Sequence, residues 1–511
     1  MGERTKNTIR NIVFGFISKI LSLLLPFVVR TIIIYKLGAE YVGIGSLFTS
    51  ILQVLSVTEL GFASAISFTM YEPIAKGETE KIIESITLLR TVYKSVGLII
   101  LLAGLCMFPF LPLLIKGDIP GDINVYILFA IYLSNTVISY LLCGYKSSIL
   151  SANQRYDVIS KIELIVTISR GLVQIAVLMF FSSYYLYTIA IPGFTLISNL
   201  MVNYYSSKMF PELKASRKWS FKGIKAIGKQ IGGIALGRIS LMCRNSFDSI
   251  IISALLGLTT VAMYSNYYLI ISSINGLTAV LMTSMAASVG NSLVLETVEK
   301  NEADHIRFDF YYELIIAFCT ICLFSLFQPF MKVWVGDNLM FPGITMVLFC
   351  IYFYVNQLAQ IRSVYSEAAG LWWHFRYLTV SEMIANIVLN IVLGIWIGVD
   401  GIILATIITA FGGSFVGCSY ITYKKLFKKS AITFFFNNGL YAVVTTVGCI
   451  LIYFINMFMK GTGVGIFIVR IVITAIFAGG YLIGIYMLNK KYRAYLIALP
   501  LTKIIKNNRR K

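Results

Sequence analysis

Long apolar runs, separated by short polar stretches, fill almost the whole chain. Each run is about 20 residues or longer, the length that a helix needs to cross the hydrocarbon core of a bilayer. Only helices and closed barrels span a bilayer, because its interior offers no water to backbone groups, and the runs lack the alternation typical of barrel strands. Candidate spans lie at residues 11–36, 41–70, 93–115, 122–146, 158–181, 184–207, 231–256, 260–292, 309–331, 339–368, 376–399, 401–423, 433–458 and 463–488.

This pattern predicts an all-α polytopic membrane protein with about fourteen transmembrane helices. Three junctions, near residues 181–184, 256–260 and 399–401, are very short, so twelve spans remain the alternative. The first run is too long for a cleavable signal, and no small-residue cleavage site ends it. We therefore expect residues 11–36 to be a permanent span.

Composition and charge agree with this interpretation and add an orientation. Of 511 residues, 58% are hydrophobic and only 13% are charged, well below the usual charged fraction of a soluble domain. If the N-terminus is cytoplasmic, 32 of the 43 Lys and Arg fall in cytoplasmic segments and only four in external ones. This bias predicts that both termini are cytoplasmic. The net charge of +20 then indicates contact with anionic lipid rather than with nucleic acid.

A basic, amphipathic segment divides the chain. Its apolar and basic side chains fall near different faces of a helix, as in helices that lie in a membrane interface; they are Trp219, Phe221, Ile224 and Ile227, and Lys218, Lys222, Lys225 and Lys229. We expect five parts: an N-terminal six-helix bundle (1–207), a cytoplasmic amphipathic linker (208–230), a C-terminal six-helix bundle (231–430), two additional transmembrane helices (431–490) and a basic cytoplasmic tail (491–511).

The two predicted bundles share a short pattern at their first turnaround. Residues 32–43 and 251–262 match at a spacing of about 219 residues, and each segment closes one span and opens the next. The match indicates an internal repeat. Because six spans restore the original orientation, the two bundles would then be related by an axis normal to the membrane, as in transporters that bind substrate between two halves.

Several motifs resemble one known family. The stretch R-T-I-I-I-Y-K-L-G-A-E-Y-V-G-I-G-S-L-F from Arg30 is similar to the first turnaround of bacterial oligosaccharide flippases, the Wzx-like polysaccharide-export group. T-E-L-G-F-A-S-A from Thr58, M-Y-S-N-Y-Y-L-I from Met263 and S-V-G-N from Ser288 are similar to other parts of the same family. This group belongs to the multidrug/oligosaccharidyl-lipid/polysaccharide exporter superfamily.

The resemblance implies a fold and a function. Its fold is a V-shaped pair of six-helix bundles around a central cavity, and two extra C-terminal helices are typical of the branch that handles polyprenyl lipids. Its function is to move undecaprenyl-pyrophosphate-linked oligosaccharide repeat units from the inner to the outer leaflet of the bacterial cell membrane. The implied partners are this substrate, membrane lipids, and a polysaccharide polymerase and other export proteins.

Seven cations lie inside predicted spans, where ionisable groups are costly and usually functional. They are Lys19, Arg30, Arg170, Arg238, Arg244, Arg362 and Arg470. Arg244 and Arg170 lie about midway along their spans. The helical rise of about 1.5 Å per residue places the other five about 10 Å from a span end. For those five, an equally good interpretation is that the side chain extends to the headgroups.

A pyrophosphate group cannot cross hydrocarbon unpaired, and guanidinium groups match phosphate oxygens well. We therefore expect a substrate-binding cavity lined first by Arg244 and Arg170, and then by Lys19, Arg30 and Arg238.

Three acidic residues are candidates for ion coupling. Asp248 follows Arg244 by four residues, so the two either form a structural ion pair or act as a switch in which Asp248 binds a cation or proton and frees Arg244. Glu59 is either a coupling acid or a partner for a lysine in the bundle. Glu163 shares a helical face with Arg170, and either takes part in coupling or faces cytoplasmic water.

The remaining chemistry is sparse. The sequence shows no metal site, no nucleophile–base pair and no phosphate-binding glycine loop, so we expect no cofactor and no enzymatic activity, with transport coupled to an H+ or Na+ gradient. Cys319 and Cys322 form a C-x-x-C within an apolar stretch and are interpreted as packing residues. His305 and His374 fall in predicted cytoplasmic loops. Paired aromatics near span ends favour an interfacial belt over sugar stacking.

Two other functions remain open. A cation-coupled multidrug antiporter would have few cations in its cavity, which the seven intramembrane cations disfavour. A membrane polysaccharide polymerase or ligase would need a long external loop, and every predicted external loop is short.

Overall fold

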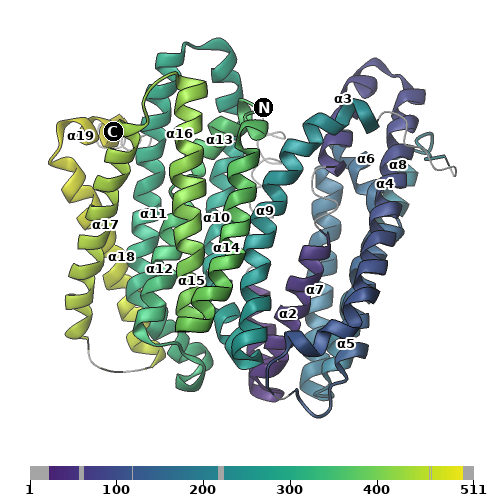
Figure 1. Ribbon diagram of the computed structural model, residues 1–511, viewed down its shortest axis with the longest axis horizontal. Helices are drawn as coiled ribbons and strands as arrows, with labels where there is room; N and C mark the ends of the chain where they lie inside the picture. The colour runs from purple at the N-terminus through teal and green to yellow at the C-terminus, as the bar shows by residue number, and fades with distance from the viewer. Residues whose placement is uncertain are drawn as a thin grey trace, which may run out of the picture. The chain divides into compact units, whose positions relative to one another are not determined.

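The computed structural model of the protein describes residues 22, 24–56, 62–117, 119–216, 224–459, 461 and 463–498. Throughout these residues the chain consists of helices and connecting turns, without β-strands (Figure 1). The chain divides into two compact units: unit 1 comprises Met1–Asn266 and Ile387–Ile402, and unit 2 comprises Tyr267–Asn386 and Ile403–Lys511.

Unit 1 begins with a helix over residues 24–36. The elements that follow in this unit are α2 (Ala39–Leu55), α3 (Phe62–Lys76), α4 (Thr79–Met107), η2 (Phe108–Leu114), α5 (Val125–Leu141), η3 (Gly144–Lys146), α6 (Ser147–Ala152), α7 (Tyr156–Phe180), α8 (Tyr184–Met209) and α9 (Ile224–Leu256). Three later helices have residues in both units: α10 (Leu258–Leu295), α14 (Trp372–Ile397) and α15 (Val399–Thr409).

Unit 2 contains the rest of the chain. Its other elements are α11 (Val298–Val335), η4 (Asp337–Leu339), α12 (Gly343–Gln357), α13 (Gln360–Ala368), the π-helix η5 (Ala410–Gly417), α16 (Cys418–Thr422), the π-helix η6 (Tyr423–Phe427), α17 (Ile432–Met457), α18 (Val464–Met487) and α19 (Lys490–Ala498).

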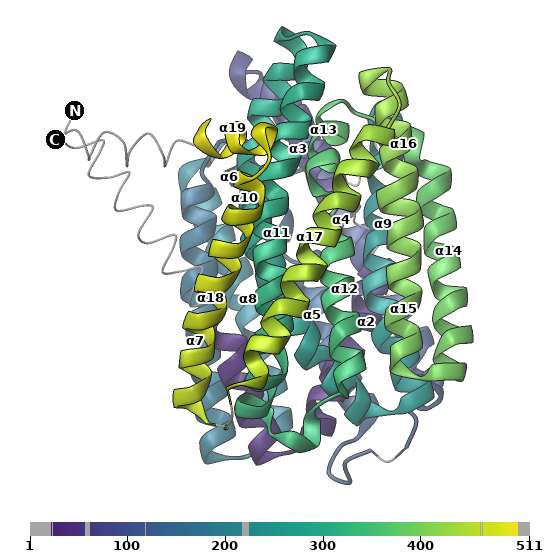
Figure 2. The same ribbon diagram turned by 90° about the vertical axis from the view of Figure 1, so that its left-hand side faces the viewer.

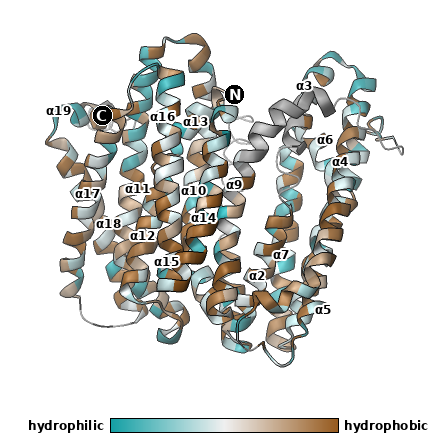
Figure 3. Cartoon of the chain, in the orientation of Figure 1, coloured by the Kyte–Doolittle hydropathy of each residue, from teal (hydrophilic) through white to brown (hydrophobic). Residues whose placement is uncertain are grey.

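The helices have the length and composition of membrane spans. In the described part of the chain, ten helices are long and apolar enough to cross a bilayer. An eleventh span follows if α5 and Gly144–Ala152, which meet at a 47° bend, are counted together. Each predicted span coincides with one helix or with consecutive helices, except where residues 11–21 and 57–61 lie outside the described part of the chain. Figure 3 shows apolar residues along the helices and polar residues mainly near their ends. The prediction of an all-α polytopic membrane protein is confirmed.

The three very short junctions are genuine helix boundaries. A residue in the left-handed backbone region lies in the first two, Ser182 (φ 47°) and Gly257 (φ 92°), and directly before the third, Gly398 (φ 65°). At Gly257 the backbone N–H donates to the carbonyls of Ile252 and Ser253, which ends α9, and α10 begins at the next residue. A left-handed residue reverses the chain in this way without a loop, which is why hydropathy alone could not define these junctions.

Two predicted loop regions differ in the structure. Residues 224–230, expected in the linker, form the first turns of α9, because no proline interrupts this 33-residue helix. Residues 217–223 of the linker lie outside the described residues. His305, expected in a cytoplasmic loop, is fully buried in α11, where its ring contacts Tyr365, Tyr423, Phe427 and Phe434.

The last helices of unit 2 pack on α11. Figure 2 shows α17 and α18 running beside α11, with the short α19 across one end. Their shared core contains Phe310 and Ile321 of α11, Tyr441 and Ile452 of α17, and Tyr486 of α18. Tyr492 and Leu496 anchor α19 to the same core, while Lys490, Lys491 and Arg493 stay exposed. The two additional C-terminal helices are therefore tightly packed parts of unit 2.

Candidate functional site

A buried carboxyl group joins three helices of unit 1. Asp248, on α9, is only 1% exposed. Its Oδ2 accepts a hydrogen bond from the Tyr264 hydroxyl of α10 (2.8 Å), and its Oδ1 accepts one from Nδ2 of Asn390 on α14 (2.7 Å). Tyr264 and Asn390 are buried as well. Neutral donors on two other helices therefore stabilise an acid that the sequence marks as an ion-coupling candidate.

Arg244 lies one helical turn before Asp248 and is also buried. The i, i+4 spacing places both side chains on one face of α9, as the sequence predicts. On the same helix, the Ser246 hydroxyl donates to Oε1 of Gln53 on α2 (3.1 Å). The central part of α9 thus carries a basic, an acidic and a hydroxyl side chain within five residues, and polar contacts hold it to α2, α10 and α14.

Arg30 occupies a second polar region of unit 1. Its Nη1 donates to the Ser265 hydroxyl and to Oδ1 of Asn266, both on α10, at 3.1 Å. These bonds cross from the first described helix to a helix about 235 residues later. The side chain is half-buried, and its guanidinium is bonded within unit 1.

Three tyrosines interact with this arginine, and one of them also interacts with a second arginine. Tyr132 of α5 and Tyr184 and Tyr187 of α8 all interact electrostatically with Arg30. Tyr187 interacts with both Arg30 and Arg170, and Arg170 is half-buried on α7. Arg30 and Arg170 come from helices far apart in sequence, yet they act on one tyrosine. We call Arg30, Arg170, Tyr132, Tyr184 and Tyr187 the arginine–tyrosine cluster.

A glycine permits the tyrosines to meet the backbone of α2. The Tyr184 hydroxyl donates to the Tyr41 carbonyl (2.7 Å) and lies 3.3 Å from the Tyr132 hydroxyl. A Cβ atom at Gly45 would lie 2.6 Å from the Tyr184 oxygen and 2.8 Å from the Tyr132 oxygen. Only glycine therefore fits at this position while both hydroxyl groups keep their places.

The predicted repeat corresponds to one structural motif. Residues 32–43 and 251–262 each form a helix, a glycine with positive φ and a second helix, with Gly38 at φ 128° and Gly257 at φ 92°. The two turns touch: the Thr259 hydroxyl donates to Oε1 of Glu40 (3.1 Å), a contact between positions 219 residues apart. Equivalent positions of the two segments thus meet each other, as happens close to a two-fold axis.

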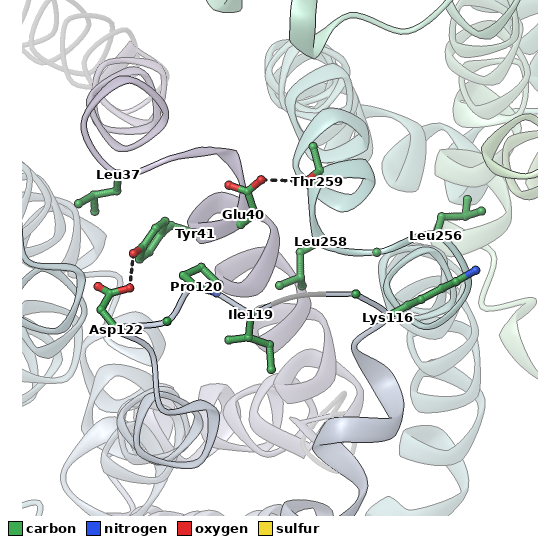
Figure 4. Close-up of a pocket in the computed structure, with 13 residues that line it drawn as sticks. Leu37, Glu40, Tyr41, Lys116, Ile119, Pro120, Asp122, Leu256, Leu258 and Thr259 are labelled. Carbon is green, nitrogen blue, oxygen red and sulfur yellow. Dashed lines mark hydrogen bonds between the residues drawn. The ribbon is translucent and has the colours of Figure 1, made fainter.

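These turns line a polar pocket of about 580 Å³ in unit 1 (Figure 4). Its charged side chains all have partners. Glu40 accepts from Thr259, Asp122 accepts from the Tyr41 hydroxyl, and Nζ of Lys116 donates to the Leu255 carbonyl (2.6 Å). Each charged side chain is already hydrogen-bonded to another residue of unit 1. These charges therefore more readily hold the turns together than bind a ligand.

The other predicted site residues are placed as follows. Lys19 and Glu59 lie outside the described residues, and Arg238 lies on α9 with its side chain outside them. Glu163 is exposed on α7, as in the alternative in which it faces water. Roles for these four residues in substrate binding or coupling remain predictions.

Two further arginines of the predicted spans donate to nearby backbone carbonyls. Arg362 is buried in unit 2, where Nη2 donates to the Ser414 carbonyl (2.9 Å) and the guanidinium lies over the Phe375 ring. Arg470 donates to the Met459 carbonyl at the end of the preceding helix. Both guanidinium groups are therefore bonded to backbone carbonyls of the protein.

Sequence reasoning missed several participants. Asn390 and Tyr264 are neutral residues in apolar helices, and only their contact with Asp248 gives them importance. Asp309 was placed at the edge of a span, yet it is buried beside Asn438. A periodic signal was available for Asp309, since Asn301, His305, Asp309 and Glu313 recur every four residues along α11.

Comparisons with known proteins identify the fold. No family model and no curated protein matches the chain. Among solved structures, it is similar to the lipid II flippase MurJ in an inward closed conformation, with 16% identity, 93% of this chain and 99% of that chain covered, and a TM-score of 0.61.

Two transporters of the multidrug resistance MATE family are similar as well. One, of the MOP superfamily and in an inward-facing conformation, has 15% identity, covers 80% of this chain and 96% of that chain, and gives a TM-score of 0.53. The other, a mutant from Vibrio cholerae, has 15% identity, covers 83% and 98%, and gives the same TM-score. The chain thus has the fold of these membrane exporters, in agreement with the superfamily that its motifs resemble.

Proposed function

We propose that the protein is a flippase for undecaprenyl-pyrophosphate-linked oligosaccharide repeat units. It would move them from the inner to the outer leaflet of the bacterial cell membrane by alternating access, to supply capsule, O-antigen or another surface polysaccharide. The exporter fold and the flippase among its structural neighbours support the class of transport. The intramembrane cations support an anionic substrate.

The arginine–tyrosine cluster is the observation that carries this proposal. Arg30 and Arg170 are half-buried within apolar helices, and both act on Tyr187. A pyrophosphate needs charged donors to replace its water, and guanidinium groups with tyrosine hydroxyls provide them. Arg244 is the third cation of this proposed path, and Lys19 and Arg238 extend it.

Asp248 is proposed as the group that couples transport to an H+ or Na+ gradient. A buried carboxyl group has a high desolvation cost as an anion, and that cost falls when it binds a proton or cation. The donors on α10 and α14 connect its state to two other helices of unit 1. Binding at Asp248 would change the field around Arg244, one turn away, as in the switch predicted from the sequence.

The experiment is a leaflet-resolved flipping assay in proteoliposomes with defined lipid-linked sugars. One charge-assisted contact contributes about 1.5–3 kcal/mol, so Arg30→Ala or Arg170→Ala should slow flipping by about ten- to a hundredfold. Arg244→Ala should abolish surface polysaccharide export while the protein still inserts. Arg376→Ala is the matched control, because this arginine lies over Trp373 and Tyr377 at the start of α14.

Full flipping by Arg30→Ala and Arg170→Ala together would remove the cluster from the substrate path. Equal loss in Arg376→Ala would show that any lost arginine harms the protein. If the wild-type protein flips glycan-free polyprenyl pyrophosphate as fast as the glycan-linked substrate, the pyrophosphate rather than the sugar is the recognised group.

A cation-coupled multidrug antiporter is the second candidate. The observation in its favour is the buried cluster of Asp248, Tyr264 and Asn390 (the Asp248 cluster), since a carboxyl group suits a cationic substrate as well as a coupling ion. Drug-driven proton or sodium efflux from the same proteoliposomes, without any flipping, would favour this function. A polysaccharide polymerase or ligase would instead release free polyprenyl pyrophosphate.

A further inference from the structure

A polar stripe runs along one face of α11 in unit 2. Asn301, His305, Asp309 and Glu313 follow one another at four-residue intervals, and all four side chains are buried. Residues four apart lie above one another on a helix. From Asn301 to Glu313 the stripe extends about 18 Å along the helix axis, at 1.5 Å per residue. The proposed flippase mechanism uses none of these residues.

The two carboxyl groups have neutral hydrogen-bond donors. Nδ2 of Asn438 on α17 donates to Oδ2 of Asp309 (3.0 Å), and the Tyr354 hydroxyl of α12 donates to Oε1 of Glu313. Glu313 also interacts electrostatically with Asp309. Two adjacent anions in a buried setting repel each other, and one bound proton removes the repulsion together with the desolvation cost of one of the two anions.

The groups that face this pair include no cation among the described residues. The neighbouring titratable groups are tyrosines: Tyr354 of α12, Tyr423 of η6, Tyr441 of α17, Tyr486 of α18 and, further along the same core, Tyr365 of α13 and Tyr492 of α19. Arg362 acts on His305, and its guanidinium is directed to the Ser414 carbonyl.

The site also has unused hydrogen-bonding capacity. Among the described residues, Oδ1 of Asn438 and the hydroxyl of Tyr486 have no hydrogen-bond partner, although each side chain is only 3% exposed. Tyr486 interacts electrostatically with Glu313. The amide of Asn438 donates through Nδ2 to an ionised Asp309 and can, by turning over, accept through Oδ1 from a protonated Asp309. Partners are thus present for both protonation states.

We propose that Asp309 and Glu313 form a proton-binding site between α11 and the α17–α18 pair. His305, one turn before Asp309, is a buried neighbour of this site, and its Nδ1 lies 3.2 Å from the Tyr423 hydroxyl. A proton fits better than sodium, because Asn438 and Tyr354 direct N–H and O–H donors, not oxygen lone pairs, at the carboxyl groups.

The reaction is the reversible addition of one proton to a carboxylate oxygen. Because Asn438 belongs to α17, protonation of Asp309 changes the contact by which α17 is seated on α11. The site therefore links pH to the packing of the two C-terminal helices. It is separate from the Asp248 cluster, which lies in unit 1.

The test is pH-difference infrared spectroscopy of the full chain in lipid nanodiscs. At neutral pH the wild type should show a carboxylic acid C=O band that is lost in Glu313→Gln or Asp309→Asn. Glu299→Gln, an exposed acid in the first turn of the same helix, should leave the band unchanged. An identical band in all three variants would overturn the proposal, as would a band that responds to sodium instead of pH.

Tyr354→Phe keeps both carboxyl groups and guards against variants that do not fold. It removes the donor to Glu313, so the C=O band should move to higher frequency, and an unmoved band would contradict the site. The spectra need no lipid-linked sugar. A failure here and a failure of the flipping assay are therefore distinct results.

Discussion

At the scale of single residues, buried polar groups in this chain depend on partners that lie far away in sequence. Asp248 meets Asn390 across 142 residues, and Arg30 meets Asn266 across 236. An unsatisfied buried polar group costs more than its hydrogen bond contributes. Neutral asparagines and tyrosines in apolar helices therefore specify this fold as much as its charged residues do.

Asn390→Ala tests this dependence. It removes one donor from a fully buried carboxyl group, so the free energy of unfolding should fall by about 1–3 kcal/mol. The protein should then melt at a lower temperature in detergent. Asn153→Ala is the matched control, because the Asn153 side-chain amide donates to the Ile149 carbonyl within its own turn and is half-exposed. Equal melting temperatures for the two variants would contradict a structural role for Asn390.

At the scale of elements, small residues decide how closely helices approach. Gly43 of α2 faces the start of α10, and a Cβ atom there would lie 2.1 Å from the Leu258 carbonyl oxygen. A backbone atom cannot turn away as a flexible side chain can. This approach holds the two related turns in contact, with the Glu40–Thr259 bond beside it.

Gly43→Ala should force α2 and α10 apart and lower the free energy of unfolding by about 1–3 kcal/mol, as overpacking does. At Gly193 on α8 an added Cβ atom meets no described residue within 4 Å, so Gly193→Ala should be neutral or slightly stabilising through helix propensity. Thermal unfolding of both variants in one detergent makes the comparison. A Gly43 variant as stable as the Gly193 variant would show that the turns can separate without cost.

At the scale of the whole molecule, the distribution of Lys and Arg predicts orientation. Both ends should be cytoplasmic, and the turn around Lys116 should be external. A fluorescent protein that folds only in the cytoplasm should therefore be bright at the C-terminus. Alkaline phosphatase, which needs the oxidising exterior, should be active when fused after Gly117 and inactive when fused after Lys429.

The reverse pattern of reporter activity would invert the predicted topology. It would place the basic loops outside the cell. The side of the protein proposed to take up the substrate would then face outward as well. Activity of alkaline phosphatase at both fusion sites would instead show an even number of spans between residues 117 and 429, against the odd number that the predicted spans require.

Part of the site could be predicted from single helices. Arg244 and Asp248 share a face because four residues make about one turn, and Arg170 lies too deep on its helix to reach an interface. The partners could not be predicted in this way. Nothing local to Arg30 indicates Asn266, and nothing local to Asp309 indicates Asn438, because both hydrogen bonds form between helices.

The sequence by itself determined the helical membrane architecture, the approximate course of the apolar segments and the expected orientation. These properties depend on run length and charge bias, which are local and additive along the chain. Only the tertiary structure decided that residues 224–230 continue into α9, that His305 is buried, and which polar groups meet. The physical reason is that apolar helices can pack in many ways, and the pairing of buried polar groups across helices selects among them.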